Sequence, residues 1–540
     1  MIQAERQRVY CIFEGAGARG LGHLGPFRSL SKHDVEFSGF AGTSAGAILA
    51  ALACVGYSAE ELYSEGTGMN ILDRLDLDTT NTDATVTNRP ARTPAKLFGD
   101  AAWLKIRSIR YVLCNRWILE TLIGLLVAVV ALGFFFYPRS ALAILVVAVL
   151  ASIAAVWRIV RGLVSLDPVK SGLDQLIAVK HHGIRNGDPV TFQDLADAGR
   201  LPLKIVAANI SKQELTVFSA ETTPHVAVSD AVCASIAIPG VFKPHHVDGN
   251  WYMDGGLVSN LPAWTFDDER SIDRDALTAA IEISVSADKS LVSERWTLAS
   301  AFKTMIFGSS ILNKRAVDRL TSERIVVDLG LLDFDVGRDR ATVIVRETES
   351  YCDNSLIARM IELPQIINDK CESTSTQCHE FIDATYKAAG FQDRMFSTRI
   401  AIGIPVGPRF RLMRLEFSSG YRDISDERIS LPIERSLVGQ AWTKNEPLYV
   451  SKSDTEIWNA SLTAAQDRWL RKLIWRDLSW VLCVPIDIDE KTRIVVTLDS
   501  DMELESDEDA QQELLDTLEG LILKEFQFLK TVERELLNGR

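Results

Sequence analysis

The stretch Phe37-Ser38-Gly39-Phe40-Ala41-Gly42-Thr43-Ser44-Ala45-Gly46 decides how this chain is expected to fold. It begins as a short apolar strand, turns at Gly42-Thr43-Ser44-Ala45-Gly46, and continues into an apolar helix over residues 47–55. A G-x-S-x-G pattern between a strand and a helix is typical of a nucleophile elbow, where small neighbours permit a tight turn and the helix N-terminus stabilises an anion. We therefore predict an α/β fold in which Ser44 is a nucleophile and Gly42 and Gly46 form the elbow.

A second glycine-rich turn precedes the elbow. Glu14-Gly15-Ala16-Gly17-Ala18-Arg19-Gly20 follows an apolar strand at residues 9–13 and leads into a helical pattern at residues 21–32. Such a turn directs backbone N–H groups at an anion. The same letters fit the G-x-G-x-x-G fingerprint of dinucleotide sites, but that pattern is a weak signal alone and would leave the later motifs unexplained.

A nucleophilic serine needs a base. In α/β hydrolases the base is a histidine late in the chain, yet His379 is the only histidine after residue 246, and it lies in a Ser/Thr-rich stretch. We expect the remaining histidines to be surface or core residues: His23, His33, His181, His182, His225, His245 and His246. Asp254 is the better candidate, because the glycines of Asp254-Gly255-Gly256 allow the backbone to bring a carboxylate close to another turn. A Ser–Asp dyad is one way of activating a nucleophile.

Four blocks of this sequence, in this order, resemble the patatin-like phospholipases: residues 15–20, 42–46, 229–244 and 254–262. The resemblance covers about residues 9–65 and 203–331. It implies a patatin-like α/β hydrolase-type sandwich around a parallel central sheet, and a lipid acyl ester as substrate. It further implies Ser44 as nucleophile, Asp254 as its base and no cofactor. The oxyanion loop that it implies consists of Gly15, Gly17, Ala18 and Arg19.

One position departs from the family pattern. Ala16 stands where the family usually has the middle of three glycines. If that position needs a positive φ, an alanine would cost about 1–2 kcal/mol. Because an oxyanion donor can be worth about 10²–10³ in rate, Ala16 leaves a catalytically silent patatin-like sensor or scaffold as an alternative. Acyl transfer from the same acyl-enzyme is a second alternative.

Residues 117–157 form the strongest compositional anomaly, since Glu120 and Arg139 are their only charges. Pro138 breaks the run, so we predict a transmembrane helical hairpin with spans at about 118–137 and 141–157. Arginines flank both outer ends, which places both termini in the cytoplasm by the positive-inside rule. The predicted location is a membrane, the bacterial inner membrane; the alternative is a buried core hairpin of a soluble protein.

Composition narrows the classes further. The chain has 540 residues and a formal net charge of −14, which argues against a broad nucleic-acid footprint. Its 8 cysteines contain no C-x-x-C pair, so we expect reduced thiols and no metal site. Residues 1–8 are polar and the apolar run at 9–13 is too short for a signal peptide core.

The C-terminal third changes pattern. Residues 351–394 suggest a helical connector with a polar interruption at 372–377, and strands are predicted from residue 397 onward. The segment Gly439-x-Ala441-Trp442, paired strands at 480–486 and 493–498, and a closing helix from Ser506 to about Val532 resemble a GAF domain. The resemblance implies an α+β fold and a small-molecule ligand or a homo-oligomer. We expect the acidic run 499–509 to be a solvated loop.

Together these patterns predict three regions: a patatin-like catalytic domain over 1–350 that includes the hairpin at 117–157, a helical connector over 351–394, and a GAF-like domain over 395–540. The predicted function is that of a membrane-anchored serine lipid acyl hydrolase of the phospholipase type, regulated by the GAF-like domain. Its predicted partners are membrane phospholipids and a small-molecule ligand, and not nucleic acid.

Overall fold

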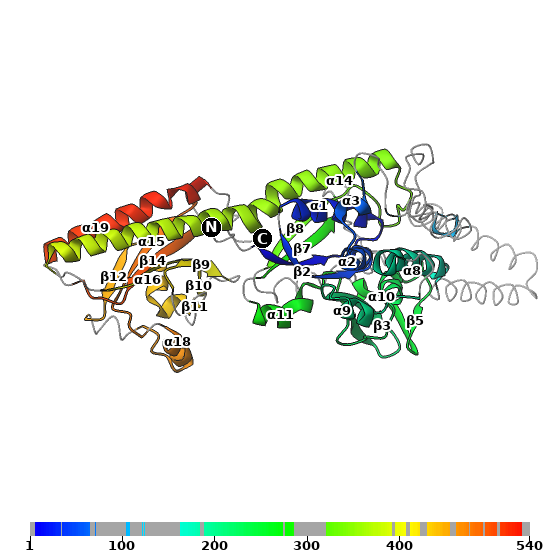
Figure 1. Ribbon diagram of the computed structural model, residues 1–540, viewed down its shortest axis with the longest axis horizontal. Helices are drawn as coiled ribbons and strands as arrows, with labels where there is room; N and C mark the ends of the chain where they lie inside the picture. Colours follow the sequence, from blue (N-terminus) through cyan, green and yellow to red (C-terminus); the bar gives the residue numbers. More distant parts are fainter. Residues whose placement is uncertain are drawn as a thin grey trace, which may run out of the picture. The chain divides into compact units, whose positions relative to one another are not determined.

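The computed structural model divides the chain into two compact units, Met1–Ile357 and Ala358–Arg540 (Figure 1). It describes residues 6–33, 35–64, 71, 104–107, 121, 124, 162–183, 188–273, 276–285, 320–390, 395–406, 411–421, 429–453, 461–474, 476–489, 492–504 and 508–531. Within these ranges no helix is long and apolar enough to cross a membrane. The hairpin predicted at 117–157 lies outside the described residues, apart from the isolated positions Thr121 and Gly124.

The first unit is built on an eight-stranded sheet. Its strand order is β5-β6-β3-β2-β1-β7-β8, and β4 pairs with β3 beside this path. The strands are β1 (Arg8–Phe13), β2 (Glu36–Thr43), β3 (Leu203–Asn209), β4 (Glu214–Phe218), β5 (His245–Val247), β6 (Asn250–Asp254), β7 (Leu277–Ser284) and β8 (Leu320–Val326). The five strands β3, β2, β1, β7 and β8 are parallel, which confirms the predicted α/β fold and parallel central sheet. Strands β4, β5 and β6 add an antiparallel edge that the sequence had not indicated.

The central strand β1 is apolar along its length because both faces of the sheet are covered. On one face the Tyr10 ring stacks on Phe266, at 4.5 Å between centroids, and Ile12 belongs to the same cluster. On the other face Phe13 meets Phe27 edge to face. The helical elements of this unit are η1 (Gly17–His23), α1 (Leu24–Lys32), α2 (Ala45–Val55), α3 (Ala59–Leu62), α8 (Asp167–His182), α9 (Phe192–Asp197), α10 (Val228–Ile236), η4 (Gly255–Leu257), η5 (Ala263–Phe266), α11 (Asp267–Ile272) and α14 (Arg338–Cys352).

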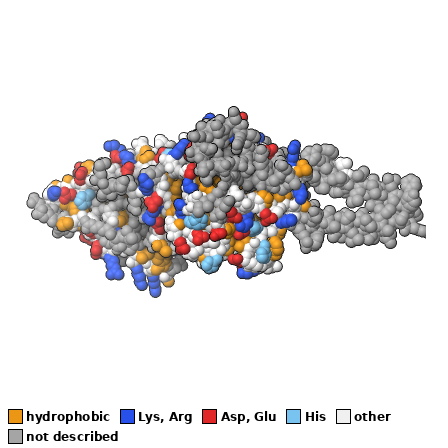
Figure 2. Space-filling model, turned by 45° about the vertical axis from the view of Figure 1, so that its right-hand side comes forward, with side chains coloured by type: hydrophobic (Ala, Val, Ile, Leu, Met, Phe, Trp, Pro, Cys, Tyr) orange, Lys and Arg blue, Asp and Glu red, His pale blue; other side chains and the backbone are white. Residues whose placement is uncertain are grey.

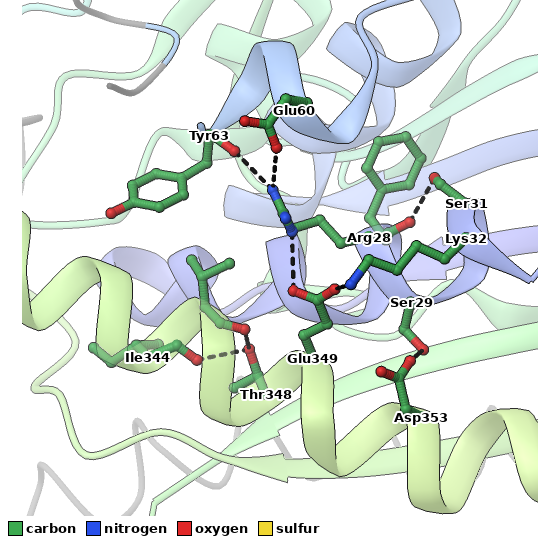
Figure 3. Close-up of polar contacts among 12 residues, drawn as sticks. Arg28, Ser29, Ser31, Lys32, Glu60, Tyr63, Ile344, Thr348, Glu349 and Asp353 are labelled. Carbon is green, nitrogen blue, oxygen red and sulfur yellow. Dashed lines mark hydrogen bonds and ion pairs between the residues drawn. The ribbon is translucent and has the colours of Figure 1, made fainter. Parts of the chain in front are cut away.

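A buried ionic network joins α1 to α14 and α3 (Figure 3). The Arg28 Nε donates to Glu349 Oε2 at 3.0 Å, and Nη1 donates to Glu60 Oε2 at 2.8 Å and to the Tyr63 carbonyl at 2.9 Å. Lys32 also pairs with Glu349. Because Arg28 and Glu349 are both buried, these contacts fix how the two helices meet.

The second unit is an α+β domain around a six-stranded antiparallel sheet of order β11-β10-β9-β14-β13-β12. Its strands are β9 (Thr398–Val406), β10 (Leu412–Ser419), β11 (Ser430–Pro432), β12 (Leu448–Ser451), β13 (Trp480–Asp487) and β14 (Arg493–Ser500). Helices α15 (Leu363–Ala388) and α19 (Glu508–Glu525) pack into the core on one face. Helix α16 (Leu437–Lys444) and the segment containing α18 (Arg468–Leu473) pack into the core on the other. The predicted strand pair β13–β14 and the predicted closing helix are confirmed.

Two local predictions in this unit are wrong. Helix α15 has no polar interruption at 372–377, because Thr374 and Ser375 are buried with the apolar face of the helix. The acidic run does not begin as a solvated loop, since Asp499 lies in β14 and pairs with Arg399 in the protein interior. In both cases tertiary packing overrides the polar character of the local sequence. The GAF-like assignment and the boundaries 350/351 and 394/395 stay predictions; the division between the two units falls within the π-helical stretch η6 (Asp353–Glu362).

Candidate active site

Ser44 occupies the sharp turn between β2 and α2. Its backbone has φ 51° and ψ −122°, a conformation that L residues rarely adopt. The two flanking glycines make the turn possible, because a Cβ at Gly42 would overlap the backbone of Gly46, and a Cβ at Gly46 would overlap the Phe13 carbonyl. The structure therefore gives Ser44 the strained strand-to-helix geometry of a nucleophile elbow.

Asp254 ends β6 directly beside this turn. The Ser44 hydroxyl donates to Asp254 Oδ2 at 2.7 Å, and the Gly256 N–H donates to Asp254 Oδ1 at 2.7 Å. Both side chains are buried. Burial raises the pKa of Asp254 to about 6, while the hydrogen bonds from Ser44 and Gly256 oppose that shift. The carboxylate is thus ionised at neutral pH but a stronger base than an exposed aspartate.

The backbone of the elbow is held by a residue that the sequence analysis passed over. The Ser44 N–H donates to Ser235 Oγ at 2.8 Å, and the Ser235 hydroxyl donates to the Val206 carbonyl at 2.6 Å. Ser235 lies on α10 and Val206 on β3, so the turn is tied to two elements far along the chain. Ser235 was quoted within the third family block, but nothing in the sequence distinguishes it from its neighbour Ser229.

The glycine-rich loop passes beside Ser44, since a Cβ at Gly15 would lie 3.3 Å from Ser44 Cβ. Several of its N–H groups are engaged: Gly15 donates to the Asn260 carbonyl at 3.0 Å, Ala18 to the Leu331 carbonyl at 2.9 Å and Arg19 to the Ala16 carbonyl at 3.2 Å. Within the described ranges no acceptor is assigned to the N–H groups of Ala16 and Gly17. These two amides are therefore the donors that the loop can offer to an anion.

The alanine that departs from the family pattern is accommodated without strain. Ala16 has φ −134°, which any residue adopts, and its side chain is buried. The left-handed position of the loop is Gly17, at φ 58°. Arg19 braces the loop by donating from Nε to the Leu329 carbonyl at 3.1 Å, and burial lowers its pKa.

A second layer supports the loop. The Asn260 amide donates to Glu14 Oε1 at 2.8 Å, and the Ile283 N–H donates to Glu14 Oε2 at 3.0 Å. The His23 ring lies 2.8 Å from the Glu14 carbonyl through Nε2, and burial lowers the pKa of His23 to about 4, so the ring is neutral and Nε2–H is the donor. Glu14 belongs to the glycine-rich turn and Asn260 to the block 254–262, but neither was predicted to have a role; their contact links two segments 246 residues apart.

Comparison with known proteins identifies this domain. Residues 12–267 match the family model described as patatin-like phospholipase. The match supports a patatin-like phospholipase domain in the first unit. A relative named "Probable lipid hydrolase 463L", from Invertebrate iridescent virus 6, is 33% identical over 73 residues, which cover 14% of this chain and 25% of that protein. The chain spans between a quarter and about a third of the length of the first two curated relatives it matches.

Two solved structures also align with the chain. VipD from Legionella pneumophila is 18% identical and covers 65% of this chain and 67% of its own, with a TM-score of 0.30. The GAF domain of an Acinetobacter phosphoenolpyruvate-protein phosphotransferase is 17% identical and covers 29% of this chain and 82% of its own, with a TM-score of 0.19.

Within the described residues, Ser44 and Asp254 make their side-chain hydrogen bonds with each other and with the Gly256 amide, and no histidine is among these partners. His23 is a core residue, and His245 pairs with Asp230 at 2.8 Å. His379 stacks on Phe396 in the second unit. In the described part of the chain no group of three His, Cys, Asp or Glu residues could hold a metal ion, and the seven cysteines there are buried and form no disulfide.

Proposed function

We propose that this chain is a serine lipid acyl hydrolase of the phospholipase type, with Ser44 and Asp254 as its catalytic dyad. The observation that carries the proposal is the 2.7 Å hydrogen bond from Ser44 Oγ to Asp254 Oδ2 at a strained elbow. The match to the patatin-like phospholipase family and the similarity to a protein named as a probable lipid hydrolase support an acyl ester of a lipid as the substrate.

In the first half-reaction Ser44 Oγ attacks the carbonyl carbon of the ester, and Asp254 Oδ2 takes the hydroxyl proton. The carbonyl oxygen becomes an oxyanion, which the N–H groups of Ala16 and Gly17 and the N-terminus of α2 stabilise. The tetrahedral intermediate then collapses by breaking the bond to the alcohol oxygen. Protonated Asp254 gives its proton to that oxygen, so the lipid alcohol leaves and the acyl group remains on Ser44.

In the second half-reaction water takes the place of the alcohol. Asp254 removes a proton from the water as its oxygen attacks the acyl carbon, and the same amides hold the new oxyanion. Collapse breaks the bond to Ser44 Oγ, which regains a proton from Asp254, and a carboxylic acid leaves. A pKa of about 6 suits Asp254 to both steps, because its protonated and ionised forms are then close in energy near neutral pH.

The remaining parts of the chain extend the proposal. The apolar residues 117–157, with two charges, anchor the protein in a membrane as a two-helix hairpin with both termini cytoplasmic. This places the dyad next to its phospholipid substrate, in the bacterial inner membrane. The second unit acts as a GAF-like regulatory module.

The test is acyl release by the full chain reconstituted in vesicles of defined phospholipids. Wild type is compared with Ser44→Ala, Asp254→Asn and the control Ser31→Ala, an exposed serine outside the site. We expect free fatty acid from wild type and the control, a fall of about 10²–10⁴-fold in Asp254→Asn, and none above background in Ser44→Ala.

Two results would contradict the proposal. Undiminished release by Ser44→Ala would remove the dyad from the reaction. An acyl chain recovered on a second alcohol instead of as a free carboxylic acid would assign the protein to the acyltransferases.

A further inference from the structure

The second unit contains a partly open cavity of about 290 Å³ between its sheet and the segment that carries α16 and α18. Its walls come from strands across the sheet, including Leu431 of β11 and Val481 of β13, and from Val438 of α16. The volume lies near the lower end of the range of about 300–1,000 Å³ that is typical of small-molecule sites. The cavity is therefore large enough for a small organic molecule.

The interior of this cavity is mainly aliphatic. Leu415, Ile429, Leu437, Leu462 and Ile474 line it together with the three apolar residues named above. Three hydroxyl groups in the wall bond to the backbone: Thr497 Oγ1 donates to the Ala401 carbonyl at 3.2 Å, Ser461 Oγ donates to the Arg435 carbonyl at 3.4 Å, and Ser436 Oγ accepts from the Gly439 N–H at 3.2 Å. A hydrocarbon chain needs no hydrogen bonds from such a wall, whereas a polar heterocycle does.

The charges of the cavity lie in two places with different roles. Inside, Arg399 and Asp499 form a bidentate pair at 2.7 and 2.9 Å, with the guanidinium over the Tyr421 ring, so this charge is balanced. Three further cationic lining residues, Lys452, Arg471 and Arg476, are exposed to solvent. Asp499 is the only acid among the described lining residues, and no ion pair is assigned to the three exposed cations there.

Figure 2 shows Lys and Arg side chains projecting beside hydrophobic ones at the lower edge of this unit, where Figure 1 places α18. A cationic rim around an apolar interior attracts an amphiphilic anion: the head group stays at the rim, partly solvated, and the apolar body fills the cavity.

We infer that this cavity binds an aliphatic carboxylate, a fatty-acid-like anion whose chain enters the apolar interior and whose carboxylate lies among Lys452, Arg471 and Arg476. The binding site stands on the cavity alone. The interpretation of this binding as product feedback on the enzyme rests on the proposed function, because an aliphatic carboxylate is the class of product that a lipid acyl hydrolase releases.

The test is calorimetric titration of the full chain in phospholipid nanodiscs with hexanoate, octanoate and decanoate, against empty nanodiscs. We expect the dissociation constant to fall about fourfold for each added methylene until the cavity is full. Octanol, which lacks the charge, binds at least about tenfold more weakly than octanoate.

Variants assign the binding to this cavity. Arg471→Glu is expected to weaken octanoate binding at least about tenfold, while Arg468→Glu, an exposed arginine on the same helix that does not line the cavity, leaves it unchanged. Val481→Trp, which fills the cavity, abolishes binding; Arg471→Glu keeps the test decisive if that variant does not fold, because its side chain is exposed.

Equal octanoate affinity in wild type and Arg471→Glu would overturn the inference. Rim-dependent binding of adenosine monophosphate that is tighter than that of decanoate would also overturn it, in favour of a nucleotide. All titrations use chains that also carry Ser44→Ala, so that no acyl product can be released from the nanodisc lipids, and the outcomes are then independent of whether Ser44 is catalytic.

Discussion

At the scale of single residues, the strained backbone of Ser44 allows the effect of the turn on stability to be measured apart from the chemistry of the Ser44 hydroxyl. A non-glycine residue at φ 51° and ψ −122° stores about 1–3 kcal/mol. Ser44→Gly relieves that strain, while Ser44→Ala keeps it and removes the same hydroxyl. Since glycine also raises the entropy of the unfolded chain by about 0.5–1 kcal/mol, we expect the glycine variant to be more stable than the alanine variant by about 1 kcal/mol.

Denaturant unfolding of the two variants, side by side, measures this difference. The comparison measures stability alone, so it does not depend on activity. A glycine variant less stable than the alanine variant would show that the turn carries no strain.

Asp254 predicts a pH-dependent difference in stability. Its pKa is about 6 in the folded chain, against 3.8 for the ordinary group, so the folded state binds the proton more tightly than the unfolded state. The free energy of unfolding of wild type, relative to Asp254→Asn, therefore falls as the pH rises from about 4 to about 6 and is constant above that. At pH 7.5 the asparagine variant is expected to be more stable by up to about 3 kcal/mol.

Unfolding curves for wild type and Asp254→Asn at pH 4, 5, 6 and 7.5 check this prediction. The advantage of the variant should vanish at pH 4. In the same range, the acyl release of wild type should decline as the pH falls below about 6, because the base becomes protonated. A stability difference that does not change with pH would mean that the carboxyl keeps its ordinary pKa.

The pair Ser44–Asp254 could be singled out from the sequence because each residue carries a local glycine signature that only its own turn requires. Ser235 could not, because its role depends on a hydrogen bond to a residue 191 positions away. The same holds for Glu14 and Asn260, which meet only when the sheet is assembled. At Ala16 the sequence suggested backbone strain that the structure does not show. The left-handed conformation of the loop lies at Gly17 instead.

At the scale of elements, the junction of α1 and α14 depends on one buried carboxylate. Glu349 accepts from Arg28 and pairs with Lys32 (Figure 3). Glu349→Gln removes the charge and leaves the buried Arg28 with Glu60 and the Tyr63 carbonyl. We expect the free energy of unfolding of the first unit to fall by about 1.5–3 kcal/mol.

Glu347→Gln on the same helix is the matched control, because Glu347 is exposed, and it should change the free energy of unfolding by less than about 0.5 kcal/mol. Replacing both buried partners, as in Arg28→Met with Glu349→Leu, should recover part of the loss. Equal effects from the two single glutamine variants would show that the network contributes nothing.

Elements with a clear period or motif could be predicted, and those whose form depends on neighbours could not. The strands β1 and β2 are short apolar runs that end in glycine turns, and both were expected. The antiparallel strand β6 was not, since Asn250–Asp254 alternates only weakly and is specified by its pairing with β3. Helix α15 was expected to break at 372–377, but it continues through these polar residues because the sheet of the second unit covers the helix.

At the scale of the whole molecule, two assignments rest on different kinds of support. Spaced motifs support the patatin-like domain, whereas composition alone supports the membrane hairpin. The patatin-like domain is supported by the family match over residues 12–267 and by motifs that bring Ser44 and Asp254 within hydrogen-bond distance. The hairpin at 117–157 stays a prediction from its apolar composition. Removal of residues 117–157 should therefore move the protein from the membrane pellet to the carbonate-soluble fraction, and a variant with Leu125→Ala in the same run should stay in the pellet.

The division into two units predicts that the stability of helix α15 depends on the rest of the second unit. Helix α15 falls in the second unit, where Ile367, Cys371, Cys378 and Ile382 are buried in one cluster with β9, β13, β14 and α19. A chain that ends at residue 390 keeps α15 but loses the sheet that covers it, and most of the stability of a helix in a protein comes from the packing of its apolar face. Hydrogen exchange over residues 363–388 should therefore be at least about tenfold faster in the chain ending at 390 than in the full chain, while amides of β1 and β2 exchange equally slowly in both. Equal protection of α15 in the two chains would mean that this helix does not depend on the second unit.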